Sequence, residues 1–132
     1  MSEYTDKVMD HFQNPRNVGT IADPSGIGKV TSSECGDIME LHIKVDDNGI
    51  ITDAKFKTFG CAAAIASSSM LTEMIIGKNV AEAEKITNNM IVKSLGGLPE
   101  MKVHCSVLGE NALKKAIDNY YKSENAHKKT EK

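Results

Sequence analysis

The feature that most constrains the fold of this chain is the alternation of apolar and polar residues over 37–59. In DIMELHIKVDD (37–47) every second residue from Met39 to Val45 is apolar, which is typical of a strand with one buried face. The triplet Asp47-Asn48-Gly49 favours a hairpin turn, and IITDAKFKTF (50–59) returns as the second strand. The pattern predicts an antiparallel sheet at the centre of the domain.

The segments around this hairpin complete the expected fold. GKVTSSE (28–34) predicts a third antiparallel strand, and the return strand is expected to bury one set of side chains: Thr52, Ala54 and Phe56. Apolar residues at helical spacing predict helices at 5–12, 61–76, within 79–94 and from about 105 to 121. We expect an α+β fold, a three-stranded antiparallel sheet with helices packed on one face. Residues 1–122 are expected to form a single domain, and the polar tail 123–132 to be disordered.

Composition narrows the classes of function. The chain has 132 residues, a formal net charge of −2 and no overall basic excess, so we expect no nucleic-acid partner. The longest wholly apolar run, CAAAIA (61–66), is too short to cross a bilayer, which predicts no membrane association. The first residues do not follow the pattern of a secretory signal, and the expected compartment is the cytoplasm.

The three cysteines all fall at the ends of expected elements. Cys35 lies between the first two strands, Cys61 opens the first long helix, and Cys105 opens the last one. An odd number of cysteines cannot form a closed set of disulfides, and in a reducing compartment it points to metal binding, catalysis or burial. The positive end of a helix stabilises the thiolate that binds metal or attacks an electrophile.

Polar residues beside two of the cysteines could complete a ligand set. Asp37 follows Cys35 by two positions, and His104 directly precedes Cys105. Three thiolates with one carboxylate or imidazole would suit zinc or a 2Fe–2S cluster. A cluster with one ligand that is not a thiolate would be held less tightly than one with four cysteines.

Each of these residues also has a structural interpretation. A single cysteine is more often a small buried residue than a ligand. Asp37 could be a turn or capping residue, and His104 a surface or capping histidine. Two other classes of function are open at this point: a cysteine enzyme that uses His104 as the base for Cys105, and an interaction module with buried cysteines.

The residues around the cysteines resemble the IscU/NifU-N family of iron–sulfur cluster scaffolds. The similar segments are YTDKVMDHFQNPRNVG (4–19), ECGD (34–37), KTFGCAAAIASSSMLTE (57–73) and HCSVLGENALKKAI (104–117). They agree with the family in order and spacing, from about Tyr4 to Tyr121. The resemblance implies the same α+β fold.

The resemblance also implies a function. These scaffolds assemble a 2Fe–2S cluster from iron and sulfur and transfer it to apo-proteins, without independent enzymatic turnover. The ligand cysteines correspond to Cys35, Cys61 and Cys105, and the other site residues to Asp37, which keeps the cluster labile, and His104. Sulfur would come as a persulfide from a cysteine desulfurase of the IscS/NifS type, with Cys105 as the first candidate acceptor. Zinc often occupies the same pocket, and a zinc-bound persulfide acceptor is the alternative function.

One loop departs from the family pattern. LPEMK (98–102) stands where the family usually has LPPVK, the docking site for a DnaK-type chaperone and its J-protein. Leu98, Pro99 and Lys102 match that motif, whereas Glu100 adds a negative charge. The departure argues against chaperone-assisted release, and a linker whose proline sets its geometry is an equal interpretation.

Overall fold

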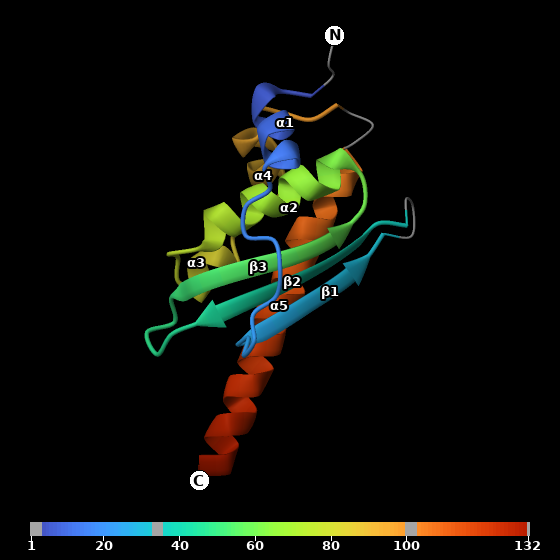
Figure 1. Cartoon of the computed structure of the whole chain (residues 1–132). Helices are drawn as coiled ribbons and strands as arrows, with labels where there is room; N and C mark the ends of the chain where they lie inside the picture. The colour runs from blue at the N-terminus through green and yellow to red at the C-terminus, as the bar shows by residue number, and fades with distance from the viewer. Residues whose placement is uncertain (1–3, 33–35, 100–102, 132) are drawn as a thin grey trace.

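A computed structural model describes the backbone of residues 4–32, 36–99 and 103–131, and their side chains except those of 103–106 and 124–131. It contains a three-stranded antiparallel sheet in the order β1-β2-β3 (Figure 1). The strands are β1 (Gly26–Thr31), β2 (Ile38–Val45) and β3 (Ile51–Phe59). The predicted sheet is confirmed, with β1 shifted toward the N-terminus relative to the expected 28–34.

A bulge near the β2–β3 turn changes one expected side-chain position. Lys44 pairs with Asp53 and Val45 with Ile51, so Thr52 has no partner in the ladder. Ile51 is buried in consequence and Thr52 is exposed. The expectation that Thr52 shares the buried face is therefore wrong, while Ala54 and Phe56 are buried as predicted.

The helices cover one face of the sheet. α2 packs on β3, α5 packs on β1 and β2, and α1 and α4 pack on these helices. Their bounds are α1 (Asp6–Gln13), α2 (Ala62–Ile75), α3 (Val80–Ala83), α4 (Asn88–Ser94) and α5 (Val103–Glu131). The core between them contains, among others, Met39, Leu41, Ile43, Leu71, Ile75, Leu113 and Ile117. Among the described helices, none is long and apolar enough to span a membrane.

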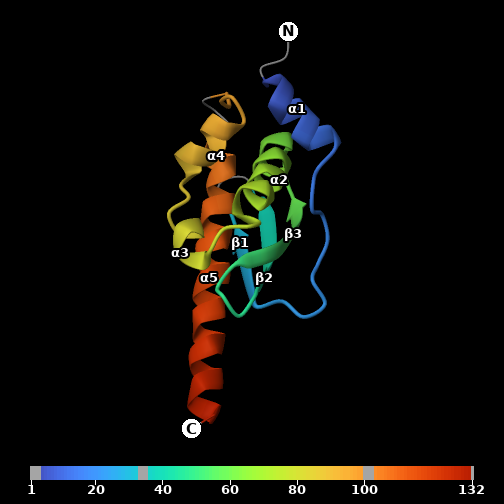
Figure 2. The same cartoon turned by 90° about the vertical axis from the view of Figure 1, so that its left-hand side faces the viewer.

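The segment after α1 crosses the outer face of the sheet. The backbone of Asn17 and Gly19 hydrogen-bonds Phe56 of β3, and the N–H of Ser25 bonds the carbonyl of Ile43 on β2. Figure 2 shows this segment on the opposite side of the sheet from α5. The outer face is thus covered in part, toward the end of the sheet where β1 begins.

Two glycines on β1 allow α5 to approach the sheet closely. A Cβ atom at Gly28 would collide with the backbone of Ala112 and Ala116, and one at Gly26 would collide with the carbonyl of Ala116. Both alanines are fully buried. This contact fixes α5 along β1.

α5 extends beyond its expected end near Tyr121 and continues to Glu131. The backbone of 123–131 is helical, so the helix is longer than the expected 105–121, and Lys132 lies outside the described residues. No glycine or proline follows Gly109. The segment KSENAHKKTEK (122–132) contains four Lys and two Glu, and both residue types favour a helix once the helix has begun.

Candidate metal centre

Three segments that carry the predicted ligands meet at one end of the sheet. These segments are the connection between β1 and β2, the start of α2 and the start of α5 (Figure 1). Asp37 directly precedes β2, and Cys61 precedes the first residue of α2. The backbone of His104 and Cys105 lies in the first turn of α5, while their side chains, and all of Cys35, lie outside the described residues.

The connection between β1 and β2 is closed by backbone hydrogen bonds. The N–H of Ser32 donates to the carbonyl of Asp37 (2.8 Å), and the N–H of Gly36 donates to the carbonyl of Ser32 (2.9 Å). These bonds fix the backbone of Asp37 where the connection between β1 and β2 ends, and they thereby limit the positions open to its carboxylate.

The side chain of Asp37 is buried, and one of its two carboxylate oxygens lacks a hydrogen-bond partner among the described residues. Asp37 is only 7% exposed, and its Oδ2 atom makes no hydrogen bond within the described part of the chain. An unsatisfied buried carboxylate is costly, so such a group calls for an explanation, such as a cation that the protein binds.

Gly60 brings this carboxylate next to Cys61. A Cβ atom built on Gly60 would lie 2.6 Å from Cγ and 2.8 Å from Oδ2 of Asp37. Any other residue at position 60 would therefore push the carboxylate away. The absence of a side chain at Gly60 lets the buried carboxylate of Asp37 lie against the residue that precedes Cys61.

Cys61 is the N-cap residue of α2, with a free and half-buried thiol. Its side chain makes no capping hydrogen bond, and the first turn of α2 contains no acidic residue. The unpaired amides and the positive end of the helix dipole therefore lie beside the sulfur. The thiol of Cys61 can therefore be reached from solvent.

The described residues form only part of a ligand set. Among them, no group of three His, Cys, Asp or Glu side chains could hold a metal ion. Asp37 and Cys61 are brought together through Gly60, and the remaining predicted ligands are Cys35, His104 and Cys105. A carboxylate and a thiolate with a third or fourth soft ligand would suit zinc or iron in a cluster rather than magnesium or calcium.

The predicted partner loop contributes to the core. Leu98 is partly buried and packs against the core cluster, and Pro99 is half-buried. Lys102 lies outside the described residues. Leu98 thus has a structural role beside any role in binding a partner.

A buried histidine to which sequence reasoning assigned no role anchors α1 to α2. His11 is 5% exposed, with Nδ1 2.8 Å from Oγ of Ser69 and Nε2 3.3 Å from Oε1 of Glu73. Ser69 Oγ also accepts the N–H of Arg16 (2.9 Å), which ties the segment after α1 to α2. Burial lowers the pKa of His11, and the neighbouring Arg16 adds to this effect. The run of three polar residues Ser67-Ser68-Ser69 in an otherwise apolar helix is the sequence signal that could have indicated a buried polar partner such as His11.

His42 has a comparable role on the outer face. It is 6% exposed, its Nδ1 accepts the N–H of Ile21 (3.3 Å), and its Nε2 lies 2.8 Å from Oε2 of Glu40. The hydrogen bond from His42 lowers the pKa of Glu40. The alternation in β2 correctly predicts that His42 points away from the core, but the crossing segment 17–25 buries it.

Comparisons with known proteins agree with this architecture. Residues 3–127 match the family described as "NifU-like N terminal domain". The Archaeoglobus fulgidus protein named "Iron-sulfur cluster assembly scaffold protein IscU 1" is 58% identical over 119 residues, which cover 90% of this chain and 77% of that protein. The Haemophilus influenzae protein named "Iron-sulfur cluster assembly scaffold protein IscU" is 55% identical over 120 residues, with 89% and 94% covered.

A solved structure shares the fold. The N-terminal part of a NifU-like protein from Brucella abortus has a TM-score of 0.73 against this chain at 22% identity. The match covers 91% of this chain and 95% of that one. At that identity the likeness concerns the fold alone. The match over nearly the whole chain and the high identity to the curated relatives are sufficient to assign the family. This chain belongs to the NifU-like N-terminal domain family.

Proposed function

We propose that this chain is a scaffold that assembles a labile 2Fe–2S cluster and transfers it to apo-proteins. The cluster is cargo, held by the thiolates of Cys35, Cys61 and Cys105, with Asp37 or His104 as the fourth ligand. The observation that carries the proposal is the buried, unpartnered Oδ2 atom of Asp37 beside Gly60 and Cys61. Membership of the family, with relatives named as IscU scaffold proteins, supports it.

The chemistry of transfer is ligand exchange. Thiolates of the acceptor replace the thiolates of this chain one after another, and the iron and sulfide leave together. Asp37 is suited to be the first ligand that is lost, because a carboxylate binds iron less strongly than a thiolate does. The half-buried position of Cys61 leaves its sulfur open to the incoming thiolate.

Sulfur would be delivered as a persulfide by a cysteine desulfurase. The thiolate of Cys105 attacks the terminal sulfur, the S–S bond of the donor breaks, and the donor leaves as a thiolate. This exchange needs no net electrons, whereas the conversion of the transferred sulfur to sulfide needs two electrons from a thiol or protein reductant. The positive end of α5, whose first turn contains Cys105, favours the attacking thiolate.

Anaerobic reconstitution tests the proposal. The protein would be incubated with ferrous iron, cysteine, a desulfurase and dithiothreitol, followed by visible absorption and by iron and sulfide analysis. We expect charge-transfer bands with about equal iron and sulfide. Cys61→Ser should lose the bands, and Asp37→Ala should retain them for longer than wild type, whereas Asp47→Ala in the exposed β2–β3 turn should behave as wild type.

The same experiment can also contradict the scaffold proposal. A colourless protein that retains zinc and gains only a persulfide would contradict the scaffold proposal, and it would favour a zinc-bound sulfur acceptor. Mass spectrometry distinguishes the two outcomes, because a persulfide adds one sulfur to the chain.

A further inference from the structure

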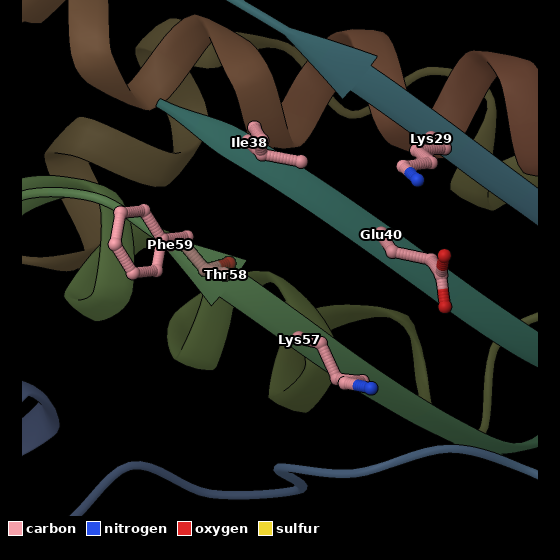
Figure 3. A pocket seen from close by; sticks show the side chains of 6 residues that line it. All are labelled: Lys29, Ile38, Glu40, Lys57, Thr58 and Phe59. Carbon is pink, nitrogen blue, oxygen red and sulfur yellow. The ribbon is translucent and has the colours of Figure 1, made fainter. Parts of the chain in front are cut away.

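An open pocket lies on the outer face of the sheet, at the end that contains the candidate metal centre. Its volume is about 310 Å³. We call its lining the outer-face patch, which consists of Lys29, Ile38, Glu40, Lys57, Thr58 and Phe59 (Figure 3). All three strands contribute to it, and the crossing segment 17–25 is not part of the lining.

The apolar part of the patch lies at the edge nearest the candidate metal centre. Phe59 is 80% exposed and Ile38 is 37% exposed. The two residues are paired across β2 and β3, so their side chains are neighbours on one face. An aromatic residue exposed to this extent beside a second apolar residue is typical of a binding surface.

The charged part forms the next row of the sheet. Lys29 pairs with Glu40, which pairs with Lys57 on the other side. The carboxylate of Glu40 is engaged by His42 at 2.8 Å. Within the described residues neither lysine forms an ion pair, although both help to lower the pKa of Glu40 after the larger effect of His42. The patch therefore presents two lysine side chains next to an apolar surface. This arrangement is complementary to a partner that has carboxylates around an apolar side chain.

The patch continues directly into the candidate ligands. Ile38 follows Asp37, and Phe59 is separated from Cys61 only by Gly60. A protein bound to the patch thus places its own residues next to the site. Cys105, the candidate sulfur acceptor, is in the helix that packs on the other face of the sheet. The outer face therefore remains open to a partner that takes the cluster away.

We infer that the outer-face patch is the docking surface for acidic apo-proteins that receive the cluster. This inference rests on the proposed function. The acceptor would contribute an apolar side chain to the pocket beside Phe59, and carboxylates to Lys29 and Lys57. The two lysines would also offset the repulsion between an acidic acceptor and the anionic thiolate site.

Transfer kinetics test this inference, with the apo form of an acidic 2Fe–2S ferredoxin as the probe. Wild type would be compared with Phe59→Ala and Lys57→Glu after each has been loaded with cluster. The matched controls are Met90→Ala and Lys93→Glu, an exposed apolar residue and an exposed lysine on α4. We expect the patch variants to transfer about tenfold more slowly and the controls to match wild type. Extraction of the cluster by a small iron chelator, which needs no docking, should be equal in all variants.

Binding of apo-ferredoxin to the metal-free chain is the second measurement. Isothermal titration should show that Lys57→Glu weakens binding, and that the wild-type affinity falls as the salt concentration rises. Equal transfer rates and equal affinities in wild type and patch variants would overturn the docking surface while leaving the scaffold function intact. Slower persulfide loading by the desulfurase with unchanged transfer would also overturn it, because the surface would then bind the sulfur donor. A wild type that binds no cluster would instead refute the proposed function.

Discussion

Asp37 is buried although one of its carboxylate oxygens has no hydrogen-bond partner among the described residues, a combination that lowers stability. Its carboxylate is buried, and Oδ2 has no hydrogen-bond partner within the described residues. Such a group costs about 1–3 kcal/mol of stability. This cost is explained if the carboxylate is itself a metal ligand, one that releases the metal easily.

This cost predicts a gain in stability when the charge is removed. Asp37→Asn keeps the shape of the side chain, and it should raise the free energy of unfolding of the metal-free protein by about 1 kcal/mol at neutral pH. Urea unfolding measures the change. Asp47→Asn, at an exposed position in the β2–β3 turn, should leave stability unchanged; a loss of stability in Asp37→Asn would show that the carboxylate is satisfied in solution.

His11 predicts how stability depends on pH. Burial lowers its pKa below the ordinary value of 6.5, so the unfolded chain binds a proton at a pH at which the folded chain does not. The stability from neutral His11 is thus fully present above pH 6.5, and it is lost as the pH falls below that value toward the lowered pKa. Thermal unfolding between pH 7.5 and 5 should show a larger loss for wild type than for His11→Gln. Parallel curves for the two proteins would contradict this role.

At the scale of elements, the packing of α5 on β1 positions the start of the helix that contains Cys105. Gly28 allows the contact, because a Cβ atom there would meet the backbone of Ala112 and Ala116. A helix that cannot approach the strand would shift along its whole length, including its first turn.

This contact predicts a strong effect of one methyl group. Gly28→Ala should destabilise the protein by about 2–3 kcal/mol, since neither backbone can move aside without losing packing. Thr31→Ala, at an exposed position on the same strand, is the control and should cost much less. Denaturant unfolding compares them, and an equal cost in both variants would show that α5 packs less closely than described.

The order of elements could be predicted from the sequence because most segments have a clear period. The alternation in β2 and the change to helical spacing after Gly60 are local signals, and both are confirmed. The bulge that exposes Thr52 depends on pairing between strands, which a single-strand pattern does not contain. The extension of α5 to Glu131 was missed because a polar composition suggested disorder, although the segment lacks helix-breaking residues.

The candidate site was predictable only in part, for a similar reason. The position of Cys61 before a helix follows from local periodicity and is confirmed in the backbone. The contact between Gly60 and Asp37, and the burial of His11 and His42, arise from segments that are distant in sequence. No local pattern reports such contacts. The side-chain positions of Cys35, His104 and Cys105 stay predictions.

At the scale of the whole molecule, the proposed ligands connect three separate parts of the fold. They come from the connection of β1 to β2, the start of α2 and the start of α5. A metal bound to all three would restrain them relative to one another, so binding would contribute to global stability.

This coupling predicts that zinc stabilises the fold. At a free zinc concentration about 100-fold above Kd, the gain is about 2.7 kcal/mol, which corresponds to a Tm increase of roughly 5–15 °C for a domain of this size. Differential scanning calorimetry should show the increase, and EDTA should reverse it. Cys61→Ser should show little of it. An equal increase in Cys61→Ser would place zinc elsewhere on the molecule.

The measurement that tests the central claim most directly is cluster transfer in the presence of a competing iron chelator. The loaded protein would be mixed with an apo-ferredoxin and an excess of chelator, and circular dichroism would follow the cluster in the acceptor. The account predicts that the ferredoxin gains its 2Fe–2S signal while the chelator takes little iron, because the cluster moves intact from one set of thiolates to the other. A cluster that stays on the chain, or iron that passes to the chelator first, would contradict it.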